Sequence, residues 1–151
     1  MGHLVVPARA PESEADMSTE VSSTQTRGLG AQLRLAGQPD LPVTVLARHD
    51  ASVPYAVRLV VVLEALDSAE SFELLVDRGL LTSGVVTGAA GEGAVQVQVV
   101  GDQALLGIED LAVVLPLRGL IELLLSSYVA APTGQDADVV IALEQRAQSL
   151  A

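Results

Sequence analysis

The sequence predicts an α+β domain of about seven mostly antiparallel strands, with a short helix after the fourth strand and two helices at the C-terminal end. Apolar residues recur at every second position through much of residues 29–115, and a period of two marks strands. From Pro116 onward the apolar spacing becomes that of an amphipathic helix. The strands come first and two helices come last, and residues 54–77 are the segment around which we expect the others to be arranged.

Residues 54–77 predict a long β-hairpin. Its first arm has apolar residues at every second position from Val57 to Leu63, and two further valines lie between them. Residues 67–70 are short and polar, which is typical of a turn, and the second arm resumes at Phe72. Because the first arm is almost wholly apolar, we expect the rest of the chain to cover both of its faces.

Two shorter strands precede the hairpin. Alternation over residues 29–36 predicts the first strand, and alternation over residues 43–47 predicts the second. Residues 37–40 contain Gly, Pro and Asp, so they form the turn between these strands. Residues 48–52 are expected to turn into the hairpin, with His49 as a solvated turn residue.

A short helix and three more strands are expected after the hairpin. The helix covers residues 77–84 and ends at a glycine, as helices often do. Residues 88–93 are rich in glycine and indicate a flexible turn. The strands are predicted at residues 95–99, 105–108 and 111–115, with a tight hairpin connection at Gly101-Asp102.

The C-terminal part predicts two helices. Pro116 fits the first turn of the earlier helix, where a missing N–H is harmless. Residues 132–134 break the chain, and a last helix runs from about Asp138. The segment Arg78-Gly79-Leu80-Leu81 is echoed by Arg118-Gly119-Leu120-Ile121 where the two main helices start, which hints at a duplicated sheet-then-helix unit.

The length of 151 residues predicts one folded domain, which we place at residues 28–151. Residues 1–27 are rich in Ser, Thr, Glu and Pro and predict a disordered N-terminal tail. The chain has no cysteine, which excludes disulfides, thiolate zinc sites and a cysteine nucleophile. All of its basic residues are arginine, and this bias indicates a GC-rich genome.

The net charge of −11 argues against binding to nucleic acid, because neutralisation of phosphates supplies most of the non-specific affinity. Anionic membrane surfaces are disfavoured for the same reason. The most apolar region, residues 111–131, is interrupted by Pro116, Arg118 and Glu122, so we expect no insertion into a membrane. No signal peptide is recognised, and a cytoplasmic location is expected by default.

Candidate catalytic and metal-binding residues give no convincing site. His49, Asp50 and Ser52 could be imagined as part of a triad, but no strained nucleophile turn accompanies them. Residues 88–93 lack the GK[ST] of a phosphate loop. Asp136 and Asp138 are better explained as helix-capping residues than as calcium ligands, and the pair Glu109-Asp110 as a charged turn. We therefore predict that the protein is not an enzyme and has no cofactor or metal.

Several segments resemble the SsgA-like proteins, the SALP family of actinobacterial sporulation and cell division. Leu41-Pro42-Val43 followed by Pro54-Tyr55-Ala56-Val57 is similar to that family's "LPV…DPYAV". The order then continues with Arg78-Gly79-Leu80-Leu81…Gly84 ("RDLL..G"), Gly91-Glu92-Gly93-Ala94-Val95 ("GxGDV") and residues 116–124 ("APARALESFL"). The resemblance covers residues 32–150, approximately, and the GC-rich composition agrees with an actinobacterial source.

The sequence also departs from the family pattern. Val53 stands where the family usually has Asp, Gly79 replaces the Asp of "RDLL", and Ala94 replaces the Asp of "GxGDV". The family's tryptophans are missing. These differences question whether the surface contacts of other members are retained, and they suggest a divergent paralogue.

The resemblance implies a Whirly-like, bell-shaped fold that assembles as a homotrimer, and a septal role in positioning FtsZ or controlling septal peptidoglycan. It implies FtsZ or other SsgA-like proteins as partners. Candidate protein-interaction residues are Pro54, Tyr55 and Arg78, because core alternation explains them least; the alternative is that Tyr55 packs internally and Arg78 caps a turn. The candidate oligomer face is Leu120, Leu124 and Tyr128, with ordinary core packing as its alternative. A Whirly-like module that binds single-stranded nucleic acid is the second functional hypothesis.

Overall fold

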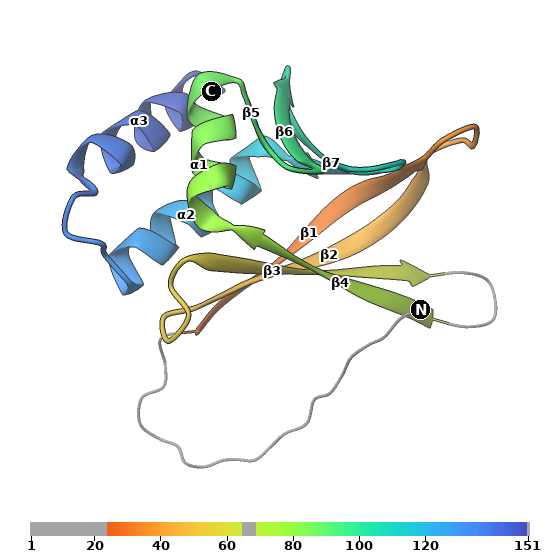
Figure 1. The fold of residues 1–151 in the computed structure, drawn as a ribbon, viewed down its shortest axis with the longest axis horizontal. Helices are drawn as coiled ribbons and strands as arrows, with labels where there is room; N and C mark the ends of the chain where they lie inside the picture. The colour runs from red at the N-terminus through yellow and green to blue at the C-terminus, as the bar shows by residue number, and fades with distance from the viewer. Residues whose placement is uncertain (1–23, 65–68, 151) are drawn as a thin grey trace, which may run out of the picture.

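A computed structural model describes residues 24–64 and 69–150, which form one eight-stranded antiparallel sheet and three helices (Figure 1). The strands are β1 (Thr24–Leu35), β2 (Leu41–Asp50), β3 (Ala56–Glu64), β4 (Ala69–Asp77), β5 (Ala89–Glu92), β6 (Val95–Val100), β7 (Gln103–Ile108) and β8 (Leu111–Pro116). The helices are α1 (Arg78–Thr87), α2 (Leu117–Ala130) and α3 (Ala137–Gln148). The sheet is curled, and the helices gather on one side of it.

The predicted α+β class is confirmed, and the sheet has one strand more than expected. The additional strand is β5, where the sequence analysis placed a flexible turn over residues 88–93. Residues 89–92 pair with residues 95–98, and Gly93 makes the tight turn between them with a φ of 63°. Helix α1 packs against β5, so tertiary contacts stabilise a strand whose small residues have no apolar period of their own.

The first strand begins earlier than predicted. Residues 24–27, assigned to the tail by the sequence analysis, pair with residues 47–50 of β2 and belong to the sheet. The rest of the predicted tail, residues 1–23, lies outside the described residues, as does the centre of the predicted hairpin turn, residues 65–68. The hairpin itself is confirmed, because β3 and β4 pair in unbroken register from Ala56↔Asp77 to Glu64↔Ala69.

The strand order is β4-β3-β2-β1-β8-β7-β6-β5. It contains two four-stranded meanders, β1–β4 and β5–β8, and each is followed by a helix. The meanders join where residues 32–35 of β1 pair with residues 111–114 of β8. The duplicated sheet-then-helix unit suggested by the Arg-Gly-Leu echo is therefore present in the topology, with one copy of the echo at the start of each helix.

The core lies between the sheet and the helices. Alternate residues of β1, β2 and β3 are buried, as their period of two requires. Helix α2 buries the apolar residues Leu117, Leu120, Ile121, Leu123 and Leu124, which are at most 1% exposed. Helix α2 thus lies across the core, and α3 contributes one fully buried leucine, Leu143.

Helix α1 is longer than predicted, because its expected last residue, Gly84, lies inside it. The helix begins at Asp77, whose side chain accepts a hydrogen bond from the Leu80 N–H at 2.9 Å, and ends at Gly88 in the left-handed conformation. Gly84 is buried against Val97 of β6, where an added Cβ would lie 2.5 Å from the Val97 Cγ1 atom. A glycine is needed there for close contact between helix and sheet.

We predict that Gly84→Ala lowers the free energy of unfolding by about 1–3 kcal/mol, because the new methyl group would overlap Val97. Urea unfolding followed by circular dichroism measures the change. The matched control is Gly30→Ala in β1, where no atom lies within 4 Å of the added Cβ and little change is expected. Equal stability of the two variants would contradict the close contact.

Candidate protein-interaction surface

The turn between β2 and β3 is held in one conformation by its own polar groups. The Asp50 Oδ1 atom accepts hydrogen bonds from the Ser52 backbone N–H at 2.9 Å and from the Ser52 hydroxyl at 2.8 Å. The Val53 N–H donates to the Asp50 carbonyl at 2.9 Å. The Ser52 N–H is the largest cause of a lowered pKa at Asp50, and the Ser52 hydroxyl and the Arg48 charge act in the same direction. This is an Asx-type turn, typical of Asp and Ser in loops.

His49 fixes the other side of this turn from within the core, so the expectation of a solvated histidine is wrong. Its side chain is fully buried, and its Nε2 atom lies 3.0 Å from the Pro54 carbonyl oxygen. A carbonyl only accepts, so Nε2 carries the proton in this contact. His49 is buried because it continues the inward-facing alternation of β2 at residues 43, 45 and 47.

The held turn presents Tyr55 to solvent. The Tyr55 side chain is 67% exposed, Val53 beside it is also exposed, and Pro54 is half-buried. The Tyr55 carbonyl accepts a hydrogen bond of 2.7 Å from the Arg78 backbone N–H, which ties the turn to the start of α1. An exposed tyrosine on an ordered loop is a common anchor in protein interfaces, because it buries a large area with little loss of side-chain entropy.

The backbone of Arg78 lies beside that of Tyr55, but the Arg78 side chain is part of the core rather than of this surface. It is 3% exposed, and its Nη1 atom donates to the Ser127 carbonyl at 2.9 Å and approaches the Ser127 hydroxyl at 3.3 Å. The guanidinium carbon lies 4.0 Å from the centre of the Tyr128 ring. Ser127 is in the last turn of α2, where the helix dipole favours a cation. A single subunit therefore does not offer the Arg78 guanidinium to a partner.

The candidate oligomer face on α2 is also internal. Leu120 and Leu124 are fully buried within the subunit, and Tyr128 is 8% exposed. The Tyr128 hydroxyl lies 2.9 Å from the Thr82 hydroxyl oxygen, so its polar end is satisfied inside the fold. This burial supports the alternative that these residues are ordinary core residues, because the apolar side of α2 faces the sheet.

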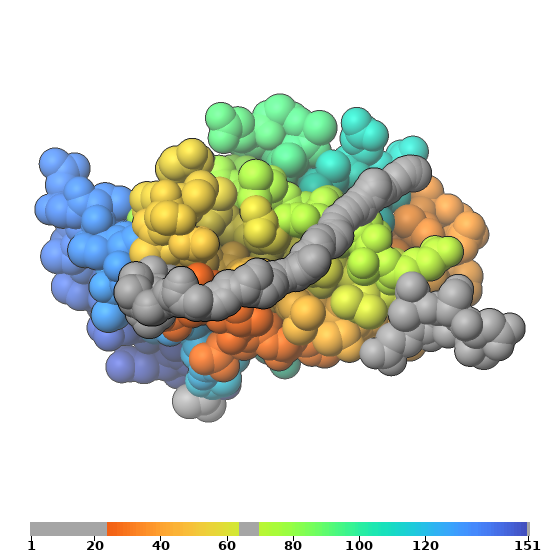
Figure 2. Space-filling view, turned by 90° about the horizontal axis from the view of Figure 1, so that it is seen from below, coloured from red at the N-terminus to blue at the C-terminus, as the bar shows by residue number. Residues whose placement is uncertain are grey.

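The outer side of β1–β4, which is turned toward the viewer in Figure 2, carries exposed apolar residues, and we call it the outer sheet face. Leu46 of β2 and Leu75 of β4 are exposed there, the latter at 65%. Arg48 and Arg58 are directly opposite each other on β2 and β3, and Arg58 forms an ion pair with Glu73. The expectation that both faces of the β3 arm are covered is therefore wrong for the described residues, since its outward residues 58, 60 and 62 are exposed or half-buried.

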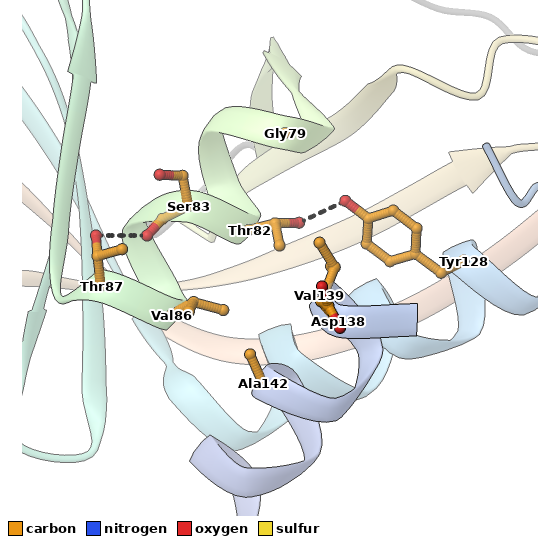
Figure 3. Close-up of a pocket in the computed structure, with 9 residues that line it drawn as sticks. All are labelled: Gly79, Thr82, Ser83, Val86, Thr87, Tyr128, Asp138, Val139 and Ala142. Atoms are coloured by element: carbon orange, nitrogen blue, oxygen red, sulfur yellow. Dashed lines mark hydrogen bonds between the residues drawn. The ribbon is translucent and has the colours of Figure 1, made fainter. Parts of the chain in front are cut away.

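The helices enclose a shallow groove of about 350 Å³ (Figure 3). It is lined from α1, α2 and α3 by Gly79, Thr82, Ser83, Val86, Thr87, Tyr128, Asp138, Val139 and Ala142. The lining is mostly apolar, and the Thr82 and Tyr128 hydroxyl groups hydrogen-bond to each other across it. Asp138 is the only titratable acid among these residues, so the groove lacks the carboxylate pair that acid–base catalysis commonly uses.

The other residues considered for chemistry have structural positions. Asp50 bonds Ser52 while His49 bonds Pro54, so the imagined triad is not assembled. Asp136 accepts hydrogen bonds from the backbone and hydroxyl of Thr133 just before α3, and Glu109 turns with a φ of 57°. Among residues 24–64 and 69–150, no cluster of His, Asp and Glu could hold a metal ion. Within the same residues, no helix is long and apolar enough to cross a membrane.

Two solved structures of division proteins are similar to this chain. The crystal structure of an SsgA-like sporulation-specific cell division protein from Thermobifida fusca matches 89% of this chain and 100% of its own, with a TM-score of 0.66 and 24% identity. SsgB of Streptomyces coelicolor matches over 81% of this chain and 99% of its own, with a TM-score of 0.60 and 23% identity. This chain has the SsgA-like fold. The resemblance inferred from the ordered motifs is thereby confirmed at the level of fold.

No protein-family model and no curated protein sequence matches the chain. The residues missed by the sequence analysis are His49, Leu46 and Leu75. The inward alternation of β2 was an available signal for His49. In β3, apolar residues occupy both faces, so its outward face has no clear local signal. In β4, Phe72, Leu74 and Val76 alternate with polar residues, which was an available signal that Leu75 faces outward.

We predict that Asp50→Asn makes the unfolding free energy less sensitive to acid. The folded pKa of Asp50 is lowered, so its stabilising contribution is present above the unfolded value of about 3.9 and is lost as the pH falls through the folded pKa. Urea unfolding at a series of pH values from about 6 down to about 2.5 measures this loss. The difference in stability between wild type and variant should shrink on acidification, and a constant difference would contradict the role of this carboxylate.

We predict that Arg78→Met lowers the free energy of unfolding by about 2–3 kcal/mol, because the buried Ser127 carbonyl loses a charge-assisted donor. The matched control is Arg118→Met, at the equivalent position of the echo in α2, where the arginine is exposed and a change of at most about 0.5 kcal/mol is expected. Thermal and urea unfolding compare the two. Equal losses of unfolding free energy in the two variants would show that the buried contacts of Arg78 do not contribute to stability.

Proposed function

We propose that this chain is a non-enzymatic protein of actinobacterial cell division and sporulation that acts at the septum through protein contacts. The observation that carries the proposal is the SsgA-like fold, shared over most of the chain with two proteins described as acting in sporulation or its cell division. The described residues also offer an ordered surface without a catalytic constellation, which suits a binding protein. Positioning FtsZ or controlling septal peptidoglycan is the specific role that we propose.

The contact surface that we propose is the β2–β3 turn with the adjoining outer sheet face. Tyr55 supplies an exposed aromatic anchor on a turn held by His49 and Asp50. Arg48, exposed on β2 just before the turn, takes the role that the sequence analysis gave to Arg78. FtsZ is generally acidic, and long-range attraction to a chain of charge −11 is absent. Recognition must then rest on short-range contacts, with an arginine that pairs with carboxylates.

A homotrimer with a Whirly-like arrangement remains part of this proposal. Its support is the apolar surface that the described subunit leaves exposed, such as Val129 of α2 at 81% and Ile141 of α3. Light scattering at micromolar concentration measures the assembly, and a monomer there would refute it.

Binding of single-stranded nucleic acid receives less support. Successive bases stack on neighbouring aromatic side chains. Among the described residues, Tyr55 is exposed while Phe72 is half-buried and Tyr128 is buried, so no exposed aromatic pair is available. We expect no submicromolar affinity for a single-stranded oligonucleotide at physiological salt.

The proposed contact is tested by replacing Tyr55 and measuring both folding and binding. We predict that Tyr55→Ala melts within a few degrees of wild type, because the side chain is largely exposed, and that it weakens pull-down of purified FtsZ about ten-fold or more. Val100→Ala, which removes an exposed apolar side chain on β6, is the matched control and should bind normally. Normal binding by Tyr55→Ala would refute this surface.

The cellular role is tested separately with a fluorescent fusion in the native host. Accumulation at division septa supports the proposal. A diffuse signal throughout vegetative growth and sporulation would refute the septal role, whatever the binding of Tyr55→Ala.

A further inference from the structure

The two ends of the sheet are different. Strand β5 at one end has four residues, which is a short edge of the kind that limits unwanted pairing. Strand β4 at the other end has nine residues, from Ala69 to Asp77. It contains no proline or lysine, and its pairing with β3 has no bulge. Strand β4 therefore lacks the proline and the bulge that protect many long edges, and carboxylates are its charged residues.

The register determines which backbone groups of β4 point away from the sheet. In an antiparallel ladder, alternate residues direct both their N–H and C=O groups to the same neighbour. The Arg78 N–H donates to the Tyr55 carbonyl in continuation of the ladder, so even-numbered residues face β3. Ser71, Glu73 and Leu75 then direct their N–H and C=O groups to the open edge. No hydrogen bond from another described segment reaches these groups.

The side chains beside this edge define the chemistry of its partner. Glu70, Glu73 and Asp77 are exposed, and the strand itself has no cationic residue. Glu73 also pairs with Arg58 of β3, and Asp77 also accepts a hydrogen bond from the Leu80 N–H. Leu75 lies among these carboxylates and is 65% exposed. Glu73, Leu75 and Asp77 share one face of the strand, and the half-buried residues Phe72 and Leu74 lie on the other. An extended segment with basic residues on the first face and apolar residues on the second complements both faces.

We propose that the β4 edge binds an extended peptide segment of a partner protein by β-strand addition, and that this segment alternates basic with β-branched apolar residues. Main-chain hydrogen bonds to Ser71, Glu73 and Leu75 supply the pairing, and the acidic side chains select for charge. A second copy of β4 fits less well, because it brings three further carboxylates to the same edge. The edge adjoins the outer sheet face through Leu75, but its pairing uses the backbone of β4 and is tested without FtsZ, so the inference does not depend on that contact.

The probe is a short labelled peptide in which arginine and valine alternate, titrated against the full chain by fluorescence anisotropy. Its control is the same peptide with every backbone nitrogen methylated, which keeps charge and side chains but removes the N–H donors of both edges. We expect the N-methylated peptide to bind about ten-fold more weakly or worse. We also expect the unmodified peptide to slow hydrogen exchange in residues 69–77. Equal binding of the two peptides would show simple charge attraction and overturn the proposal.

A protein variant tests the same contact from the other side. Leu75→Pro removes one outward N–H and leaves the ladder to β3, since proline is tolerated where the N–H faces away from the sheet. Leu75→Ala keeps the N–H and loses only the side chain. We expect Leu75→Pro to abolish peptide binding and Leu75→Ala to weaken it a few-fold. If Leu75→Pro has a much lower melting temperature than wild type, the comparison of the methylated and unmodified peptides tests the proposal by itself.

Two other occupants of the edge give distinct results. Dimerisation of the free protein that the peptide dissolves would assign the edge to a second copy. Protection of residues 69–77 in the monomer without any peptide would assign it to another segment of this chain. Either result would overturn the proposal.

Discussion

A buried guanidinium links the start of α1 to the last turn of α2 within the core. Arg78 begins α1 directly after β4, and its side chain crosses to the last turn of α2, where the Ser127 carbonyl and the Tyr128 ring surround it. A charge at this depth requires such partners, because an unpaired buried cation is strongly unfavourable. Arg146 of α3 repeats the arrangement by donating to the Val85 carbonyl in the last turn of α1. Arg78 thus links α1 to the C-terminal end of α2, and Arg146 links α3 to the C-terminal end of α1.

The same residue connects the core to the candidate surface. While the Arg78 side chain binds α2, its backbone N–H binds the Tyr55 carbonyl, and His49 holds Pro54 from the core side. Tyr55 is therefore exposed on a turn whose backbone is fixed at both sides. A partner that binds a fixed turn loses less conformational entropy than one that must order it. A substitution that changes the packing of Arg78 would therefore displace the Tyr55 turn, although Arg78 itself does not contact the partner.

The net charge of the chain limits how such a surface can recognise a partner. Nineteen acidic residues stand against eight arginines, and two of those arginines, Arg78 and Arg146, are committed to helix ends. The outer sheet face keeps Arg48 and Arg58 beside exposed leucines, while the β4 edge carries carboxylates. The two surfaces therefore suit partners of opposite local charge, and both rely on short-range fit in a chain whose overall field repels anions.

The sequence alone determined the α+β class, the β3–β4 hairpin and the helices near residues 117 and 137, because these elements carry their period in consecutive residues. It also indicated the ordered motifs of an SsgA-like protein. Only the tertiary structure decided the role of residues whose partners are distant in the chain. Strand β5 forms because α1 and β6 pack against it, and Arg78 and Leu120 are internal because α2 lies across the sheet. The faces of β3 were equally undetermined, since a strand with apolar residues on both sides does not say which side the helices cover.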